Sequence, residues 1–104
     1  MTQVAVIAKL TAVEGKSEDL RAEIADLVAQ VRDTEQSTLV YAAAQNTDDP
    51  NVFWFYELYG SAEAAAAHST GDALANAGKR MRGLLAGPPE VHRLTMIAAK
   101  GLPE

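Results

Sequence analysis

Residues 48–61, DDPNVFWFYELYGS, contain five of the six aromatic side chains of this 104-residue chain. In the run from Val52 to Tyr59 both alternate sets of side chains are mainly apolar, although one set includes the carboxylate of Glu57. Aromatic and β-branched residues favour a strand over a helix. A strand in a sheet with one wet face alternates apolar and polar residues. The segment therefore predicts a central strand that is covered on both faces.

Turn signals and apolar periodicity divide the rest of the chain into further elements. Four strands are predicted, at residues 3–12, 38–45, 52–59 and 90–99. Three helices are predicted, at residues 17–32, 62–68 and 73–85. The first helix carries one apolar stripe at helical spacing, formed by Leu20, Ile24, Leu27, Val28 and Val31. Ser17 and Ser61 are the expected N-caps.

This βαββα(α)β order is the split βαβ pattern of ferredoxin-like α+β folds, with a four-stranded antiparallel sheet. The length predicts one domain over residues 1–104, in which residues 100–104 form a loose tail. Helices cover only one face of such a sheet, and a bare aromatic face would promote aggregation. A second copy of the chain across a two-fold axis is the simplest cover for that face. The pattern therefore predicts a homodimer.

Composition excludes several classes of function. The net charge of −5 and the pI of about 4.9 argue against a nucleic-acid partner, because phosphate binding needs a basic face. The chain has no cysteine, so it has no disulfide, thiolate metal site or cysteine nucleophile. No run approaches the roughly 18 apolar residues of a membrane span. A cytoplasmic protein without membrane contact is expected.

Three stretches, AVIAKLTAVEGKSEDL, DDPNVFWFYELYGSAEAAAAHST and LLAGPPEV, resemble the antibiotic biosynthesis monooxygenase (ABM) family of the dimeric α+β barrel superfamily. The most specific part, residues 49–68, contains an Asp-Pro-Asn hairpin, an aromatic strand ending in Glu-x-aromatic, a small-residue helix and a histidine. The resemblance implies a dimer whose sheets pack face to face. It also implies a ligand cavity between the sheet and the helices of each subunit.

The resemblance further implies a cofactor-independent monooxygenase that oxidises a quinol, an anthrone or a related aromatic phenol with O₂. The substrate itself would supply the electrons. The heme-degrading branch of the family carries an iron-ligating histidine in the later helix, whereas ALANAGKRM in this chain contains none. With two histidines and no cysteine, the chain is expected to need no metal or heme. The family commonly has tryptophan where this chain has Tyr59.

His68, Glu57 and Tyr59 are the candidate catalytic residues. An unperturbed histidine titrates near pH ~6.5, so His68 is a candidate base; the alternative is an exposed histidine stabilised by the helix dipole. A carboxylate inside an aromatic strand is costly unless it is paired or protonated. Glu57 therefore either orients a pocket or forms a salt bridge with Arg93 or Lys9 across the sheet. Tyr59 is a candidate hydrogen-bond donor to a substrate oxygen.

Tyr41, Phe55 and Trp54 are the candidate substrate contacts. Tyr41 is a second possible hydrogen-bond donor, whereas large aromatics at strand spacing more often serve core or dimer packing. His92 is expected to be structural, at a dimer seam or a sheet edge. Two other functions stay open: a ligand-binding dimer without turnover, and a polyketide cyclase or isomerase that uses the same cavity and base.

Overall fold

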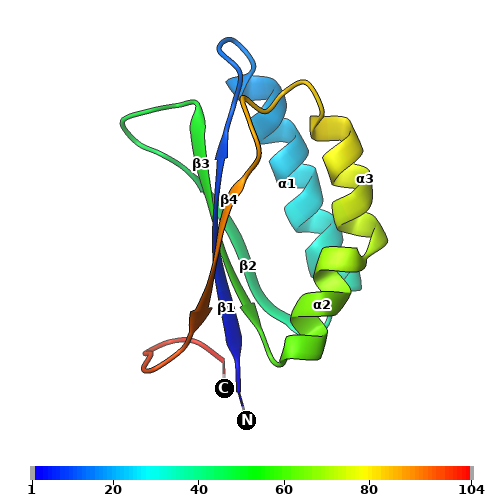
Figure 1. The fold of residues 1–104 in the computed structure, drawn as a ribbon, viewed down its shortest axis with the longest axis vertical. Helices are drawn as coiled ribbons and strands as arrows, with labels where there is room; N and C mark the ends of the chain where they lie inside the picture. The colour runs from blue at the N-terminus through cyan, green and yellow to red at the C-terminus, as the bar shows by residue number, and fades with distance from the viewer. Residues whose placement is uncertain (1, 104) are drawn as a thin grey trace.

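In the computed structural model, which describes residues 2–103, helices cover one face of a four-stranded antiparallel sheet (Figure 1). The strands are β1 (Val4–Thr11), β2 (Thr38–Gln45), β3 (Val52–Tyr59) and β4 (Glu90–Thr95). The helices are α1 (Ser17–Thr34), α2 (Ala62–Thr70) and α3 (Asp72–Met81). The strand order is β2-β3-β1-β4, so the aromatic strand β3 lies inside the sheet. The predicted ferredoxin-like α+β fold is confirmed.

The starts of the helices differ in how they are capped. The prediction that Ser61 caps α2 is confirmed, because its Oγ accepts a hydrogen bond from the Ala64 N–H at 3.1 Å. Ser17 as the cap of α1 is wrong. The Lys16 carbonyl already accepts from the Leu20 N–H at 2.9 Å, so Lys16 is the cap position and Ser17 is the first helical residue.

Two elements end four residues earlier than predicted. The last strand ends at Thr95 instead of residue 99, because Thr95 pairs with Val4, the first residue of its only neighbour β1. The third helix ends at Met81 instead of residue 85. Gly83 follows with a φ of +87°, a left-handed conformation that ends a helix at low cost. The ends of β2 and β3 are those predicted.

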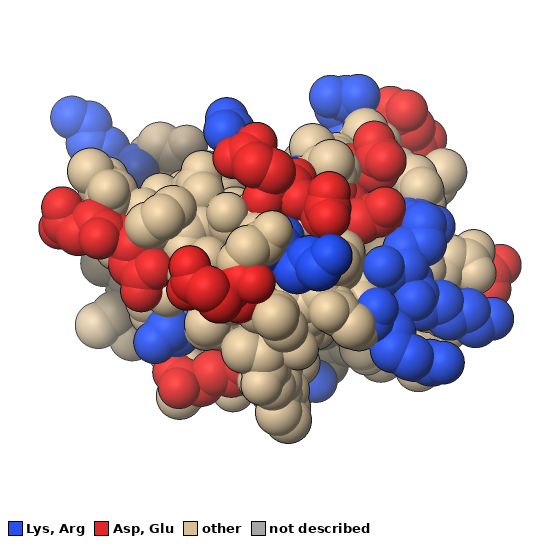
Figure 2. Space-filling model, turned by 90° about the horizontal axis from the view of Figure 1, so that it is seen from above, with Lys and Arg blue, Asp and Glu red and all other residues tan. Residues whose placement is uncertain are grey.

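The core lies between α1, α3 and the covered face of the sheet. The apolar stripe of α1 is buried there, at Leu20, Ile24, Leu27 and Val31. These side chains pack in one cluster with Phe53 and Phe55 of β3 and Met81 of α3. Most charged side chains lie at the surface, and Figure 2 shows both signs of charge at one end of the molecule.

The opposite face of the sheet has no helix over it (Figure 1). Trp54 and Tyr56 lie half-buried on this face. The Lys9 ammonium lies 5.6 Å from the centre of the Trp54 ring, and the Trp54 indole N–H donates to Asn46 Oδ1 at 3.0 Å. Lys9 of β1 and Asn46, which directly follows β2, thus hold the tryptophan in place.

At the end of the chain, the Gln3 side-chain amide donates to the Pro103 carbonyl at 2.7 Å. This contact ties the tail, predicted to be loose, to the start of the chain as far as residue 103; residue 104 lies outside the described residues. None of the helices in residues 2–103 combines the length and the apolar character needed to cross a membrane.

Leu20 tests the packing of α1 on the sheet. Its side chain is fully buried, at 0% exposure, and Leu→Ala in a core costs about 2–5 kcal/mol. Each kcal/mol lowers the Tm of a domain of this size by roughly 4–8 °C. We therefore expect Leu20→Ala to lower the Tm in thermal denaturation by about 10 °C or more. Leu39, 36% exposed, provides the matched control Leu39→Ala with a much smaller effect. Equal effects of the two variants would contradict this packing.

Candidate functional site

A cavity of about 370 Å³ opens between the covered face of the sheet and the helices. Its walls are mostly apolar and include Val6, Ala8, Leu10, Leu27, Leu74 and Met81. The polar side chains that line it are Tyr41, Glu57, Tyr59, His68, Ser69 and Arg93. An apolar hollow of this size with a few convergent polar groups is typical of small-molecule sites.

The strand period places the polar groups of the sheet together. Phe55, Glu57 and Tyr59 alternate along β3, so all three side chains point toward the helices. Tyr41 of β2 is the register partner of Glu57 and therefore lies on the same face. One short stretch of sheet thus supplies two hydroxyls and a carboxyl group to one wall of the cavity.

His68 belongs to helix α2, which packs over this part of the sheet. Ala64, Ala65 and His68 form its buried face at helical spacing. The two alanines pack against Val6 and Tyr59, so a helix of small residues lies close to the sheet. Gly71 then separates α2 from α3, and a Cβ there would lie 2.9 Å from the Ala67 carbonyl oxygen.

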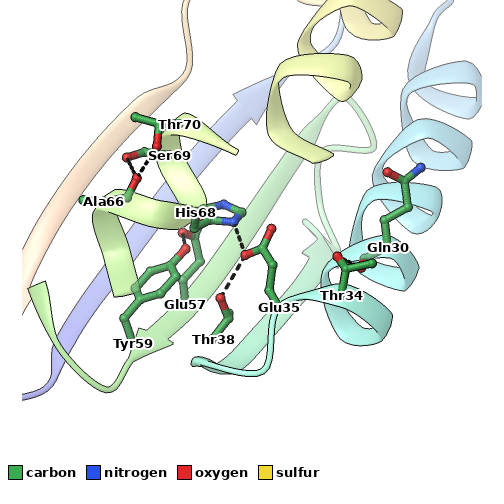
Figure 3. A network of polar contacts seen from close by, with 10 residues as sticks. All are labelled: Gln30, Thr34, Glu35, Thr38, Glu57, Tyr59, Ala66, His68, Ser69 and Thr70. Carbon is green, nitrogen blue, oxygen red and sulfur yellow. Dashed lines mark hydrogen bonds and ion pairs between the residues drawn. The ribbon is translucent and has the colours of Figure 1, made fainter. Parts of the chain in front are cut away.

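The His68 side chain is only 5% exposed. Its ring centre lies 4.9 Å from that of Tyr41 and 5.5 Å from that of Tyr59. Its Nδ1 lies 2.7 Å from Oε1 of Glu35, a residue at the end of α1 (Figure 3). The alternative of an exposed helix-end histidine is therefore wrong, because the buried face of α2 carries the ring inward.

Glu57 is 8% exposed and accepts a hydrogen bond of 2.5 Å from the Tyr59 hydroxyl. Burial raises the pKa of the Glu57 carboxyl, against the lowering effects of the Tyr59 hydrogen bond and of nearby His68. Burial and the contact with Glu57 also raise the pKa of the Tyr59 hydroxyl far above its ordinary value. Tyr59 therefore remains a protonated donor at physiological pH, and its proton is directed at Glu57.

The predicted salt bridge of Glu57 with Arg93 or Lys9 is wrong. Lys9 points to the opposite face of the sheet, where it lies over Trp54. Arg93 is on the cavity face, but Val6 pairs with both Arg93 and Glu57 and therefore lies between them. Within residues 2–103, Glu57 forms no ion pair with either residue.

Two of the three predicted substrate contacts line the cavity. Phe55 and Tyr41 pack together with ring centres 5.3 Å apart. Burial and the negative charges of Glu57 and Glu35 raise the pKa of the Tyr41 hydroxyl, which therefore stays protonated. In the described part of the chain the Tyr41 hydroxyl forms no hydrogen bond, so it is available to a bound molecule.

Trp54 is the exception, and its prediction as a substrate contact needs correction. Its neighbours Phe53 and Phe55 lie on the helix-covered face, so the period of two places the Trp54 ring on the opposite face of the sheet. His92 lies at the sheet edge on β4, as expected, with its Nε2 3.0 Å from Glu90.

Glu35 and Thr38 complete the polar group and were not predicted. Thr38 Oγ1 donates to Oε1 of Glu35 at 3.0 Å, the same oxygen that contacts His68. One signal in the sequence was available: a negative charge at the C-terminal end of a helix opposes the helix dipole. Glu35 at the end of α1 is such an unfavourable charge. Exceptions to local sequence preferences of this kind are common at functional sites.

No group of three or more His, Asp or Glu side chains within residues 2–103 is placed to hold a metal ion. The polar groups at the cavity form instead two separate hydrogen-bonded pairs: Glu57 with Tyr59, and His68 with Glu35, which lies behind the cavity wall. Such a wall can exchange protons with a bound molecule and can donate hydrogen bonds to its oxygen atoms.

A model of the antibiotic biosynthesis monooxygenase family matches residues 3–80. The chain belongs to this family. Similar ABM structures include a Caulobacter crescentus protein described as a candidate antibiotic biosynthesis monooxygenase, with 28% identity, a TM-score of 0.87, and coverage of 93% of this chain and 92% of that one. A Pseudomonas aeruginosa protein has 26% identity and a TM-score of 0.86, and the match covers 94% of this chain and 97% of that one. A Nitrosomonas europaea protein of unknown function has 25% identity and a TM-score of 0.86, and the match covers 100% of this chain and 97% of that one. No curated protein matched the sequence.

Glu57→Gln tests how much the buried Glu57 carboxyl lowers the folding stability of this ABM protein when it ionises. A carboxyl whose pKa is raised in the folded state contributes stability below its unfolded pKa and loses it as pH rises. Glutamine keeps an acceptor for Tyr59 but does not ionise. We therefore expect Glu57→Gln to have a higher Tm than the wild type at pH ~7–8, with the advantage disappearing toward pH ~4.

The control for this measurement is Glu63→Gln on the exposed surface of α2, which should give no such pH-dependent gain. A constant difference in Tm between Glu57→Gln and the wild type across the pH range would contradict the raised pKa.

Proposed function

We propose that the protein is a monooxygenase that oxidises a quinol, an anthrone or a related aromatic phenol with O₂ and needs no metal or organic cofactor. The observation that carries this proposal is the apolar cavity of about 370 Å³ with His68, Tyr41 and the Glu57–Tyr59 pair on one wall. Membership of the ABM family supports the same reaction class.

The proposed reaction needs one proton acceptor and no external reductant. His68 takes the phenol or enol proton, and the substrate anion transfers one electron to O₂. The resulting substrate radical and superoxide combine in a carbon–oxygen bond. The carbon then loses its hydrogen as a proton, the O–O bond breaks, and a carbonyl group and one water form. The two oxidised C–H bonds of an anthrone methylene supply all four electrons that O₂ accepts.

The other groups of the wall hold the substrate. The Tyr41 hydroxyl, which stays protonated because burial raises its pKa, donates a hydrogen bond to a substrate oxygen. The Tyr59 hydroxyl is held by Glu57, and this pair forms the polar end of the cavity. Phe55 and the aliphatic walls pack against the aromatic rings and limit access of water to the reactive anion.

Oxygen uptake by the purified protein with a panel of quinols, anthrones and naphthols tests this function. We expect one O₂ consumed per product, one atom of ¹⁸O from ¹⁸O₂ in the product, and no loss of rate with a chelator. His68→Asn keeps an N–H near the position of Nδ1 and removes Nε2, so the rate should fall roughly 10²–10⁴-fold. His92→Asn, at the exposed sheet edge, is the matched control and should keep the wild-type rate.

The other outcomes identify the alternatives. Saturable binding of the panel without O₂ uptake would replace the monooxygenase by a ligand-binding protein. Conversion to a product of the same oxidation state would replace it by a cyclase or isomerase. A rate that returns only with added iron would contradict the cofactor-free reaction.

We further propose that the protein is a homodimer in which two copies pack through the sheet face that carries no helix. Ile7, Trp54 and Tyr56 lie half-buried at the centre of this face, and Leu94 is 45% exposed at its edge. Apolar surface of this kind on a single chain is typical of an interface. An isologous contact would cover the same patch on both copies.

Tyr56→Glu tests this interface. An unpaired charge buried at the centre of a contact is strongly unfavourable, so we expect the variant to be monomeric in analytical ultracentrifugation while the wild type is dimeric. Ala22→Glu, on the exposed side of α1, adds the same charge elsewhere and should remain dimeric. A folded wild-type protein that sediments as a monomer would contradict the proposal.

A further inference from the structure

The contact between Glu35 and His68 determines which ring nitrogen carries a proton. An ionised carboxylate only accepts hydrogen bonds, so both groups that contact its Oε1 must donate. Thr38 Oγ1 is one donor, at 3.0 Å, and His68 Nδ1 is the other, at 2.7 Å. A neutral imidazole with a proton on Nδ1 has its lone pair on Nε2.

His68 lies at the border between two hollows. A second, polar hollow of about 750 Å³ lies between the end of α1 and helices α2 and α3. Glu35 lines only this polar hollow, whereas His68 lines both the polar hollow and the apolar cavity. Since Glu35 occupies Nδ1, Nε2 is the ring nitrogen available to a molecule in the apolar cavity.

Several titratable groups lie around His68, and Glu35 is the one in direct contact with a ring nitrogen. Tyr41 of β2 and Tyr59 of β3 stay neutral, because burial raises the pKa of both hydroxyls. Glu57 is engaged by Tyr59. Asp72 of α3 lines the polar hollow but forms no ion pair with His68 within residues 2–103.

We propose that Glu35 is the positioning residue of this site: it holds His68 as the Nδ1–H tautomer and presents Nε2 as the base to the apolar cavity. When Nε2 takes a proton, the Glu35 carboxylate lies 2.7 Å from the resulting imidazolium and compensates its charge. The tautomer follows from the contact alone, whereas its use as a base rests on the monooxygenase function proposed above.

Nitrogen NMR of the histidine-labelled protein tests the tautomer without any substrate. The chain has two histidines, and His92→Asn assigns the remaining signals to His68. At the alkaline end of the titration we expect His68 to carry its proton on Nδ1. Glu35→Ala removes the acceptor and should move the proton to Nε2. Glu90→Gln alters the exposed pair of the other histidine and should leave the His68 signals unchanged.

Glu35→Gln separates the hydrogen bond from the charge. Its amide oxygen still accepts from Nδ1–H, so the tautomer should be retained, but the imidazolium loses its counter-charge. On a substrate found by oxygen uptake, both Glu35 variants should lower kcat with little change in KM. The loss should not exceed the roughly 10²–10⁴-fold expected for loss of the base itself. Circular dichroism of each variant establishes that it is folded.

The outcomes separate this proposal from the proposed function. A wild-type His68 with its proton on Nε2, or signals that do not change in folded Glu35→Ala, would overturn the role of Glu35 whatever the activity. The expected tautomer together with an absence of oxygen uptake would leave Glu35 as the positioning residue and overturn the monooxygenase. Wild-type kcat in folded Glu35→Ala would overturn the positioning role in catalysis.

Discussion

The hydrogen bond between Tyr59 and Glu57 is the contact on which the polar wall of the cavity depends. Burying a carboxyl group without a partner in the middle of a sheet would cost several kcal/mol. Tyr59 lies two residues further along β3, on the same face, and supplies the partner from within the strand. Most of the remaining cavity lining is apolar, and His68 and Tyr41 lie next to the pair.

The order of the elements and the ends of two strands could be predicted, because local signals determine them. The Asp-Pro-Asn turn and the aromatic run mark both ends of β3 in the residues themselves. The end of β4 could not be predicted in this way. Residues 96–99, MIAA, are at least as apolar as the strand itself, yet β4 stops at Thr95 because β1 offers no further partner.

The part of the site that lies on β3 could be predicted from the alternation of side chains along the strand. A period of two brings Phe55, Glu57 and Tyr59 to one face, and the same rule moves Trp54 to the other. The contact of His68 with Glu35 could not be predicted in this way. Glu35 is 33 residues away along the chain, and the two meet only because the end of α1 lies next to the last turn of α2.

The junction of α2 and α3 constrains the position of His68. Gly71 donates its N–H to the His68 carbonyl at 3.2 Å, and a side chain at position 71 would collide with the carbonyl of Ala67. Room for a larger side chain there requires movement of the last turn of α2, which carries the imidazole. Gly71 lines the polar hollow and His68 lines both hollows, so a larger residue at position 71 would shift the imidazole and, through it, change the apolar cavity as well.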